Sequence, residues 1–381
     1  MIRLAILSIS LLTVMSGAAV APAVADIIAY FPNSSDMLGK MVLTTPALTI
    51  IPVALVTGLL SSRISRKHLV YTGIFFYILG GAGGGLATSI PFLLSMRAVL
   101  GIGVGILMPL STGIIADIWS GEEKARTMGL ASAASNLGGF IAMLLSGLLA
   151  AVSWRASFLI YLLGIAVWVL IFFFLPENRP TAIVKSNSTK GAGQLVSYIR
   201  WGIGMFLLMI AFYSIPVNIA IYLQNHHIGD SRMAGAAMAV MTAASFLTGL
   251  AYGNLKTVLR GWLPSLSLAV FAISYYGLSA FPSVLPLFCC LMLNGMAFGI
   301  LVPSIMDGVT KTAEHTSGTA GTSVVTSFLF AGQFASPLIM SETSALIFGP
   351  GISNIYLTLA FGAGLTGALA FVLRITASKR V

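Results

Sequence analysis

Two short stretches of this 381-residue chain repeat each other: GILMP at Gly105–Pro109 and GILVP at Gly299–Pro303, 194 residues further on. Both copies lie inside long apolar segments. Further matches have the same offset or a neighbouring offset of 191: Pro22 with Pro216, GGF at Gly138–Phe140 with GQF at Gly332–Phe334, and TGL at Thr57–Leu59 with TGL at Thr248–Leu250. Because self-similarity at a fixed offset marks an internal repeat, the sequence indicates two similar halves.

The composition indicates a membrane protein. Hydrophobic residues make up 57% of the chain and charged residues only 8%, whereas soluble proteins are about 25% charged. The formal net charge of +10 can mark a nucleic-acid binder, but in a membrane protein it reflects basic loops, so we expect no nucleic-acid partner. The two cysteines, Cys289 and Cys290, are adjacent in an apolar run. They therefore outline neither a disulfide framework nor a zinc site.

Twelve segments are long and apolar enough to cross a bilayer, which takes roughly 20 residues. They run approximately over 4–29, 37–60, 69–87, 92–116, 127–152, 158–175, 201–223, 233–253, 263–279, 284–305, 319–340 and 355–373. We predict an all-α membrane protein with twelve transmembrane helices in two six-helix bundles, 1–176 and 201–381, joined by a polar linker at 177–200. The first segment, with Ala23–Ala25 near its end, also resembles a cleaved secretory signal. Cleavage would leave eleven spans and remove Pro22, the partner of Pro216.

Basic residues in the loops predict the orientation. With the N-terminus in the cytoplasm, sixteen Lys and Arg residues lie inside and three lie outside, a strong positive-inside bias. The inside set is Arg3, Arg63, Arg66, Lys67, Lys124, Arg126, Arg179, Lys185, Lys190, Arg200, Lys256, Arg260, Lys311, Arg374, Lys379 and Arg380, and the outside set is Lys40, Arg155 and Arg232. We therefore expect a multi-pass protein of the plasma membrane with both termini and the linker in the cytoplasm.

Two motifs resemble the major facilitator superfamily. Between its second and third spans that family carries G-x-L-a-D-R-x-G-R-K, and this chain reads GLLSSRISRK over Gly58–Lys67, with Ser62 in place of the acid and Ser65 in place of the second glycine. In span four the family pattern R-x-x-q-G is matched by RAVLG at Arg97–Gly101. The resemblance implies the major facilitator fold and secondary transport by alternating access.

Three other stretches resemble one branch of that family, the bacterial drug:proton antiporters with twelve transmembrane helices. They are WRASF at Trp154–Phe158, LPE at Leu175–Glu177 and APAVADIIAYFP at Ala21–Pro32. That branch usually carries a glycine-proline pair in span five, where this chain has Ala142 and Met143. Proton antiport is therefore implied by the general likeness and not by this signature.

Asp26 and Arg97 are the candidates for proton coupling, because charge inside a bilayer is costly and by default functional. Arg97 lies about six residues, or roughly 9 Å, from the predicted outer loop at 89–91, and Asp26 lies at a similar depth in the first span. The resemblance places spans one and four on the same cavity, so we expect Arg97 to attract Asp26 and keep it ionised. The alternative for Asp26 is an interfacial carboxylate solvated at the membrane edge.

A second cluster is expected to form a cytoplasmic gate. Asp117 ends the fourth span, and the resemblance pairs it with the basic residues that follow the second span. The residues assigned to the gate are Gly58, Arg63, Arg66, Lys67, Asp117 and Arg126. Asp307, at the end of the tenth span, is interpreted as part of an ordinary solvated rim, which is also the alternative for Asp117.

Uncharged polar residues inside the spans are candidates for the substrate cavity. They are Asn136, Asn218, Asn294 and Gln333, with Tyr222 close to Asn218. The resemblance places spans one, four, seven and ten around the cavity, which favours Asn218 and Asn294. Each amide can alternatively form hydrogen bonds between helices.

The sequence shows no nucleophile–base pair and no cluster of metal ligands, so we expect neither an enzyme nor a bound metal or cofactor. We predict a monomeric secondary transporter in the lipid bilayer that exports small lipophilic or amphipathic molecules and is coupled to protons. An importer, a uniporter or a dedicated metabolite exporter of the same fold remains open. A membrane-embedded enzyme or a scaffold is the alternative of a different class, and paired halves with buried charge argue against a passive scaffold.

Overall fold

The structure, a computed structural model, describes residues 1–61, 63–175, 192–312 and 318–378. Within these ranges the regular secondary structure is entirely helical, which confirms the predicted all-α class. Contacts divide the chain into two compact units. Unit 1 comprises Met1–Lys185 and Asp230–Ala236, and unit 2 comprises Ser186–Gly229 and Ala237–Val381.

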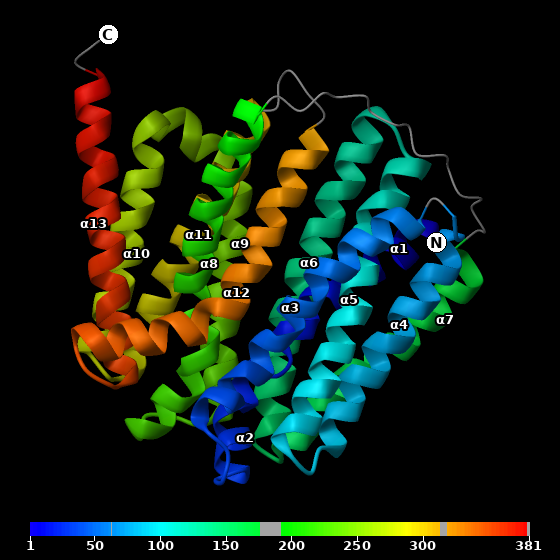
Figure 1. Cartoon of the computed structure of the whole chain (residues 1–381), viewed down its shortest axis with the longest axis horizontal. Coiled ribbons are helices and arrows are strands. Elements are labelled where there is room, and N and C mark those ends of the chain that lie inside the picture. Colours follow the sequence, from blue (N-terminus) through cyan, green and yellow to red (C-terminus); the bar gives the residue numbers. More distant parts are fainter. Residues whose placement is uncertain (62, 176–191, 313–317, 379–381) are drawn as a thin grey trace. The chain divides into compact units, whose positions relative to one another are not determined.

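Unit 1 is a bundle in which α5 is central (Figure 1). Helices α3 and α4 both pack along α5, and α1 packs against α6 and α5. The elements of this part of the chain are α1 (Ile2–Ala18), the 3₁₀ helix η1 (Ala21–Ala23), α2 (Val24–Tyr30), α3 (Asp36–Leu60), α4 (Arg66–Gly83), η2 (Gly84–Leu86), α5 (Ile90–Ile118), α6 (Gly121–Ala150), η3 (Trp154–Leu162) and α7 (Leu163–Phe174).

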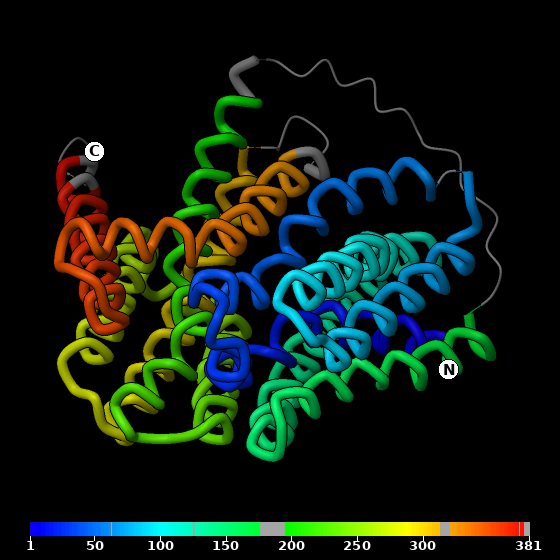
Figure 2. Tube along the Cα trace, turned by 60° about the horizontal axis from the view of Figure 1, so that its bottom comes forward, coloured from blue at the N-terminus to red at the C-terminus, as the bar shows by residue number. Residues whose placement is uncertain are grey.

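Unit 2 is a second helical bundle. Helix α12 packs along α8, and α10 packs against both α13 and α11; the α8–α12 pair is visible as the green and orange tubes in Figure 2. The elements are α8 (Ala192–Asn225), α9 (Ser231–Leu259), η4 (Arg260–Trp262), α10 (Leu263–Ala280), α11 (Val284–Thr312), α12 (Gly318–Ile347) and α13 (Ile352–Ser378). The first residues of α9 belong by their contacts to unit 1.

The helices agree with the predicted spans. Eleven stretches of the described chain are long and apolar enough to cross a membrane. One of them, Ser231–Ala280, is 50 residues long and contains two helices, α9 and α10, separated by the short η4. The structure is therefore consistent with twelve transmembrane helices.

Local sequence explains where several helices begin. Serine precedes α3, α4 and α5, and the hydroxyls of Ser35, Ser65 and Ser89 each accept a hydrogen bond from a backbone N–H in the first turn of the helix. Such capping satisfies a donor that has no partner inside the helix. A cap matters more in a membrane protein, because lipid offers no alternative hydrogen-bond partner.

One boundary differs from the prediction. The linker was expected to extend to Arg200, but α8 begins at Ala192. The extra turns are explained by apolar residues among the polar ones, since Tyr198 is buried and its ring lies where a Cβ on Gly321 of α12 would be. Residues 176–191, which include most of the predicted linker, and Ser62 of the family motif lie outside the described residues.

The internal repeat is confirmed at the level of helix packing. In unit 1, a Cβ on Gly101 of α5 would collide with the carbonyl oxygen of Pro46 on α3. In unit 2, a Cβ on Gly295 of α11 would collide with the carbonyl oxygen of Met241 on α9. The two glycines are 194 residues apart, so the repeated sequence places the same close backbone contact in both bundles.

Candidate functional site

Arg97 lies at the centre of unit 1 and is fully buried, with 0% of its surface exposed. Its Nε donates a hydrogen bond to the carbonyl oxygen of Val42 (2.8 Å), Nη1 to the hydroxyl of Tyr161 (2.6 Å) and Nη2 to the carbonyl oxygen of Ser16 (3.0 Å). The Tyr161 hydroxyl in turn donates to the same Ser16 oxygen (2.7 Å). One guanidinium group therefore connects α5 to α3, η3 and α1.

This arrangement satisfies a buried cation with neutral oxygens. A charge in a low-dielectric interior is tolerated only when its donors are well paired, and the planar guanidinium serves three acceptors in different directions. Tyr161 was not identified from the sequence, although it follows the WRASF motif that was. The signal that could have found it is a tyrosine in an otherwise apolar segment, because a buried tyrosine hydroxyl usually finds a polar partner.

Asp26 has a different neighbour from the one expected. It lies in the first turn of α2, and its carboxylate accepts a hydrogen bond from the hydroxyl of Ser231 in the first turn of α9. The three hydrogen bonds of Arg97 described above end on Val42, Tyr161 and Ser16.

Two of the charged groups predicted for the gate of unit 1 meet at one end of the bundle. Arg66, at the start of α4, forms an ion pair with Asp117, near the end of α5. Lys67 donates a hydrogen bond to the carbonyl oxygen of Phe172 on α7 (3.4 Å). Arg63 and Arg126 are exposed. No described atom lies within 4 Å of a Cβ placed on Gly58, so packing in this structure does not require a glycine there.

Unit 2 has a corresponding ion cluster that was interpreted from the sequence as a solvated rim. Asp307, on α11, accepts hydrogen bonds from Nζ of Lys256 on α9 to both of its carboxylate oxygens (2.8 Å each). Lys311, four residues further along α11, lies 3.1 Å from the same carboxylate. The Asp307–Lys311 spacing could have been noticed in the sequence, because residues four apart are neighbours on a helix.

The predicted cavity residues fall into a buried and a less buried group. Asn218, Tyr222 and Asn294 are buried, with 2%, 1% and 0% exposure, whereas Asn136 and Gln333 are intermediate. The Nδ2 of Asn294 donates to the hydroxyl of Ser274 on α10 (3.0 Å). The amides of Asn218 and Asn136 each donate to the carbonyl four residues earlier in their own helices.

Two buried acceptors in unit 2 have unused capacity. Among the described residues, no donor reaches the side-chain oxygen of Asn218 or that of Asn294. Buried polar atoms usually have a partner, so these oxygens are available to water or to a bound compound. The Tyr222 hydroxyl, in contrast, is used: it donates to the carbonyl oxygen of Leu278 on α10 (2.6 Å).

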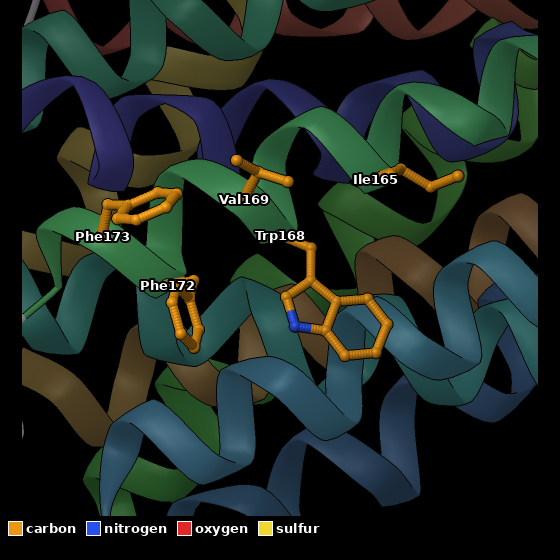
Figure 3. Close-up of a pocket in the computed structure, with 5 residues that line it drawn as sticks. All are labelled: Ile165, Trp168, Val169, Phe172 and Phe173. Atoms are coloured by element: carbon orange, nitrogen blue, oxygen red, sulfur yellow. The ribbon is translucent and has the colours of Figure 1, made fainter.

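One hollow of about 300 Å³ lies along α7, and it contains none of the predicted site residues. Its lining is Ile165, Trp168, Val169, Phe172 and Phe173, shown in Figure 3. All five side chains come from one helix and are largely apolar. Specific ligand sites combine an apolar lining with a few placed polar groups, and this lining supplies only the indole N–H of Trp168.

Two further observations concern metal-ligating side chains and the position of Glu342. Within the described ranges, no group of three or more His, Cys, Asp or Glu side chains is arranged to hold a metal ion. Helix α12 extends to Ile347, beyond the end predicted for that span, so Glu342 lies on a helix and not in a loop. The Glu342 side chain is exposed.

Comparisons with known proteins identify a family and several distant relatives. The family model described as Major Facilitator Superfamily matches residues 6–337. Multidrug resistance protein 3 of Bacillus subtilis (strain 168) is 30% identical over 119 residues, which are 31% of this chain and 23% of that protein. Quinolone resistance protein NorA of Staphylococcus aureus (strain Mu50 / ATCC 700699) is 27% identical over 145 residues, 38% of this chain and 37% of that protein.

A sugar transporter is similar at the same level. The arabinose-proton symporter of Escherichia coli (strain K12) is 27% identical over 148 residues, 39% of this chain and 31% of that protein. Each of these alignments covers well under half of the relative's length.

Solved structures share the fold along nearly the whole chain. A bacterial homolog to the human lysosomal transporter Spinster, in an inward-facing and unoccupied conformation, superposes with a TM-score of 0.73 at 18% identity, covering 98% of this chain and 94% of that one. The nucleoside transporter NupG superposes with a TM-score of 0.76 at 10% identity, covering 97% and 98%. At these identities the likeness shows the fold alone.

Proposed function

Because this chain belongs to the major facilitator superfamily and is therefore a multi-pass membrane transporter, we propose that it exports small lipophilic or amphipathic compounds in exchange for protons. Two of the relatives described above are named for multidrug and quinolone resistance, which supports efflux. The family and its relatives are transporters and not enzymes.

The observation that carries the proposal is Asp26. It is an acid inside the first membrane-crossing stretch, Ile2–Tyr30, where charge is expensive and as a rule functional. Its carboxylate is held by a hydroxyl donor, Ser231, and a carboxylate can bind and release a proton as its surroundings change. We assign to Asp26 the role of proton carrier.

Arg97 has a supporting role in this proposal. Its donors are already occupied by neutral oxygens, and guanidinium does not lose its proton at physiological pH. It therefore fixes α1, α3, α5 and η3 as one body and contributes a constant positive potential to unit 1, while the proton itself binds elsewhere.

The ion pairs at the bundle ends would serve as the gate. Arg66 with Asp117, and Lys256 with Asp307, each join two helices of one unit at the end where the predicted cytoplasmic loops lie. Such charges can change partners when the bundles rock during alternating access. The free carbonyl oxygens of Asn218 and Asn294 would provide the polar contacts in the substrate cavity.

A second candidate, proton-coupled import, has one observation in its favour. The arabinose-proton symporter is as similar to this chain as the quinolone resistance protein is, at 27% identity each. The two functions differ in the direction of substrate movement and not in the fold.

The test is transport by everted membrane vesicles containing the full chain. Vesicles are supplied with a proton gradient, a fluorescent dye and a panel of lipophilic cations, quinolones and sugars. Uptake of a lipophilic compound that stops when the gradient is dissipated supports efflux. Gradient-independent uptake, or movement of sugars alone, would overturn the proposal.

We also propose that the protein lies in the plasma membrane with both termini in the cytoplasm. The test uses a chain in which Cys289 and Cys290 are replaced by alanine. Two variants of this chain each carry one new cysteine: Ser120→Cys, between α5 and α6, and Ser283→Cys, between α10 and α11. An impermeant maleimide added to intact cells should label Ser283→Cys and spare Ser120→Cys. The reverse pattern would contradict the orientation.

A further inference from the structure

The first turn of α9 is held by unit 1 although the rest of that helix belongs to unit 2. Residues Asp230–Ala236 cluster with unit 1, and Ala237 onward with unit 2. The Ser231 side chain is 4% exposed and donates to the carboxylate of Asp26. The structure thus brings a buried hydroxyl, at the start of a helix shared by both units, into contact with the proposed proton carrier.

A close backbone contact accompanies this hydrogen bond. A Cβ on Gly147 of α6 would lie 2.8 Å from the carbonyl oxygen of Ser231 and 3.0 Å from Cα of Gly235. From the other side, a Cβ on Gly235 would lie 2.9 Å from Cα of Gly147. These distances are shorter than ordinary carbon contacts, so glycine at both positions lets α9 start directly against α6. The backbone on either side of Ser231 is therefore fixed, which aims its hydroxyl at Asp26.

From this geometry we infer that Ser231 is the positioning residue for the Asp26 carboxylate, and that the charge of Asp26 controls how firmly the first turn of α9 is held on α2 and α6. The inference rests on the proposed role of Asp26 as proton carrier. It adds the residue that holds the carrier and the element that responds when the carrier changes its charge.

The physical basis is the difference between a charged and a neutral acceptor. A hydrogen bond to an ionised carboxylate is roughly twice as strong as one between neutral groups. When Asp26 binds a proton, the hold on Ser231 weakens, and the first turn of α9 can separate from α2 and α6. Because α9 is one continuous helix, its later turns, which pack on Gly295 and Gly299 of α11, would respond to that release.

Other charged groups near α2 also contribute to the potential at Asp26. Helix α2 packs against α3 and η3 as well as touching the start of α9. The charged groups on these neighbouring elements are Asp36 and Lys40 on α3, Arg155 on η3, and Asp230 and Arg232 beside Ser231. Asp230 is engaged in capping α9, since its Oδ1 accepts from the backbone N–H groups of Arg232 and Met233, and Arg155 donates to the Tyr30 hydroxyl.

The test compares backbone amide exchange and transport in the full chain reconstituted in lipid nanodiscs and proteoliposomes. The variants are Ser231→Ala, Ser231→Thr and Asp26→Asn, and Ser95→Ala is the matched control because Ser95 donates only to its own helix on α5. Ser231→Ala should speed exchange of the Gly235–Ala239 amides about tenfold and reduce accumulation of substrate against its gradient. Ser231→Thr, which keeps the hydroxyl, should restore both, and Ser95→Ala should change neither.

Asp26→Asn separates this inference from the proposed function. Because it mimics the neutral acid, Asp26→Asn should speed exchange of the same amides by a smaller factor than Ser231→Ala does. It should also abolish gradient-driven accumulation of substrate. If accumulation is lost but exchange stays at the wild-type rate in both Asp26→Asn and Ser231→Ala, Asp26 is the carrier and the inference about α9 is wrong. If exchange rises in both variants but Asp26→Asn still accumulates substrate, the Asp26–Ser231 contact holds α9 as inferred, and the proposed role of Asp26 as proton carrier is wrong. Should Ser231→Ala fail to fold, Ser231→Cys, with its weaker donor, replaces it.

Discussion

The two units have the same helix contacts but different polar interiors. In unit 1 the backbone contact at Gly101 joins α5 to α3, and in unit 2 the contact at Gly295 joins α11 to α9. Four residues before the glycine, unit 1 has Arg97 and unit 2 has Leu291, and both side chains are fully buried. The packing scaffold is therefore repeated, while among the described residues the fully buried charge, Arg97, lies in unit 1.

The position next to this glycine shows the opposite difference between the units. One residue before the glycine, unit 2 has Asn294 and unit 1 has Leu100, again both buried. The Nδ2 of Asn294 donates to the Ser274 hydroxyl, and no described donor reaches its side-chain oxygen. This difference agrees with the proposal that unit 1 contains the coupling residues and that Asn294 of unit 2 offers an uncharged polar contact to the substrate.

The largest expected effect comes from giving unit 1 the residue of unit 2. Arg97→Leu would leave the carbonyl oxygen of Val42 without its donor. It would also remove one of the two donors to the Ser16 oxygen and the donor to the Tyr161 hydroxyl. We expect a loss of about 3 kcal/mol or more, because a buried network loses its central donor. Unfolding in mixed micelles measures this loss, and transport should fall with the folded fraction. Stability within 1 kcal/mol of the wild type, as a rough limit, would show that the network is unimportant for the fold.

Breaking the shared contact should harm both units to a similar degree. Gly101→Ala and Gly295→Ala each place a Cβ against a carbonyl oxygen of the neighbouring helix, and overpacking of this kind costs about 1–3 kcal/mol. Gly58→Ala is the control, since nothing described lies within 4 Å of its Cβ. In thermal unfolding experiments in detergent, both variants should have melting temperatures well below that of the control. A large loss of stability in only one of the two variants would mean that the two glycine contacts do not have the same structural role.

The ion pairs at the bundle ends should contribute less. Asp117→Asn removes the partner of Arg66, whose side chain is 16% exposed, and we expect a loss of about 1 kcal/mol. Asp307→Asn should cost less than Asp117→Asn, because the Lys256 side chain is 39% exposed and water screens the pair. Both losses should shrink in high salt. An Asp307→Asn variant less stable than Asp117→Asn would reverse our ranking of the two ends.

The smallest effect is expected from giving unit 2 the residue of unit 1. Asn294→Leu removes one hydrogen bond to Ser274 but also removes a buried oxygen without a partner. The two changes oppose each other, so stability should stay within about 1 kcal/mol of the wild type. Substrate affinity should fall if Asn294 contributes to the cavity. Unchanged affinity for every transported compound would remove Asn294 from the substrate site.

The sequence predicted the fold well because the length of an apolar segment is a property of the chain itself. The repeated glycines Gly105 and Gly299 also make equivalent helix contacts. A Cβ on Gly105 would approach the carbonyl oxygen of Ile50, and a Cβ on Gly299 would approach that of Ser245. The TGL match was misleading. The sequence match pairs Thr57 with Thr248. In the structure, Val53 lies against Gly105 as Thr248 lies against Gly299, so the packing equivalent of Thr248 is Val53, one helical turn before Thr57.

The side-chain networks were harder to predict because they depend on which helices meet. Arg97 was identified as a buried charge, but its partners Tyr161 and Ser16 lie on elements far away in the sequence, and two of its three bonds end on backbone oxygens. Backbone acceptors leave no trace in a sequence. The Asp26–Ser231 bond was missed for a similar reason: it spans 205 residues, and serine is common in helices and caps alike.

The central claim is that Asp26 carries the coupled proton, and one measurement tests it most directly. Proteoliposomes containing the wild type, Asp26→Asn or Glu342→Gln are given a proton gradient, and accumulation of a transported dye is compared with downhill exchange of the same dye. We predict that Asp26→Asn loses accumulation but keeps downhill exchange, while Glu342→Gln, altered at the exposed acid of α12, behaves as the wild type. Accumulation by Asp26→Asn at the wild-type rate would contradict the account.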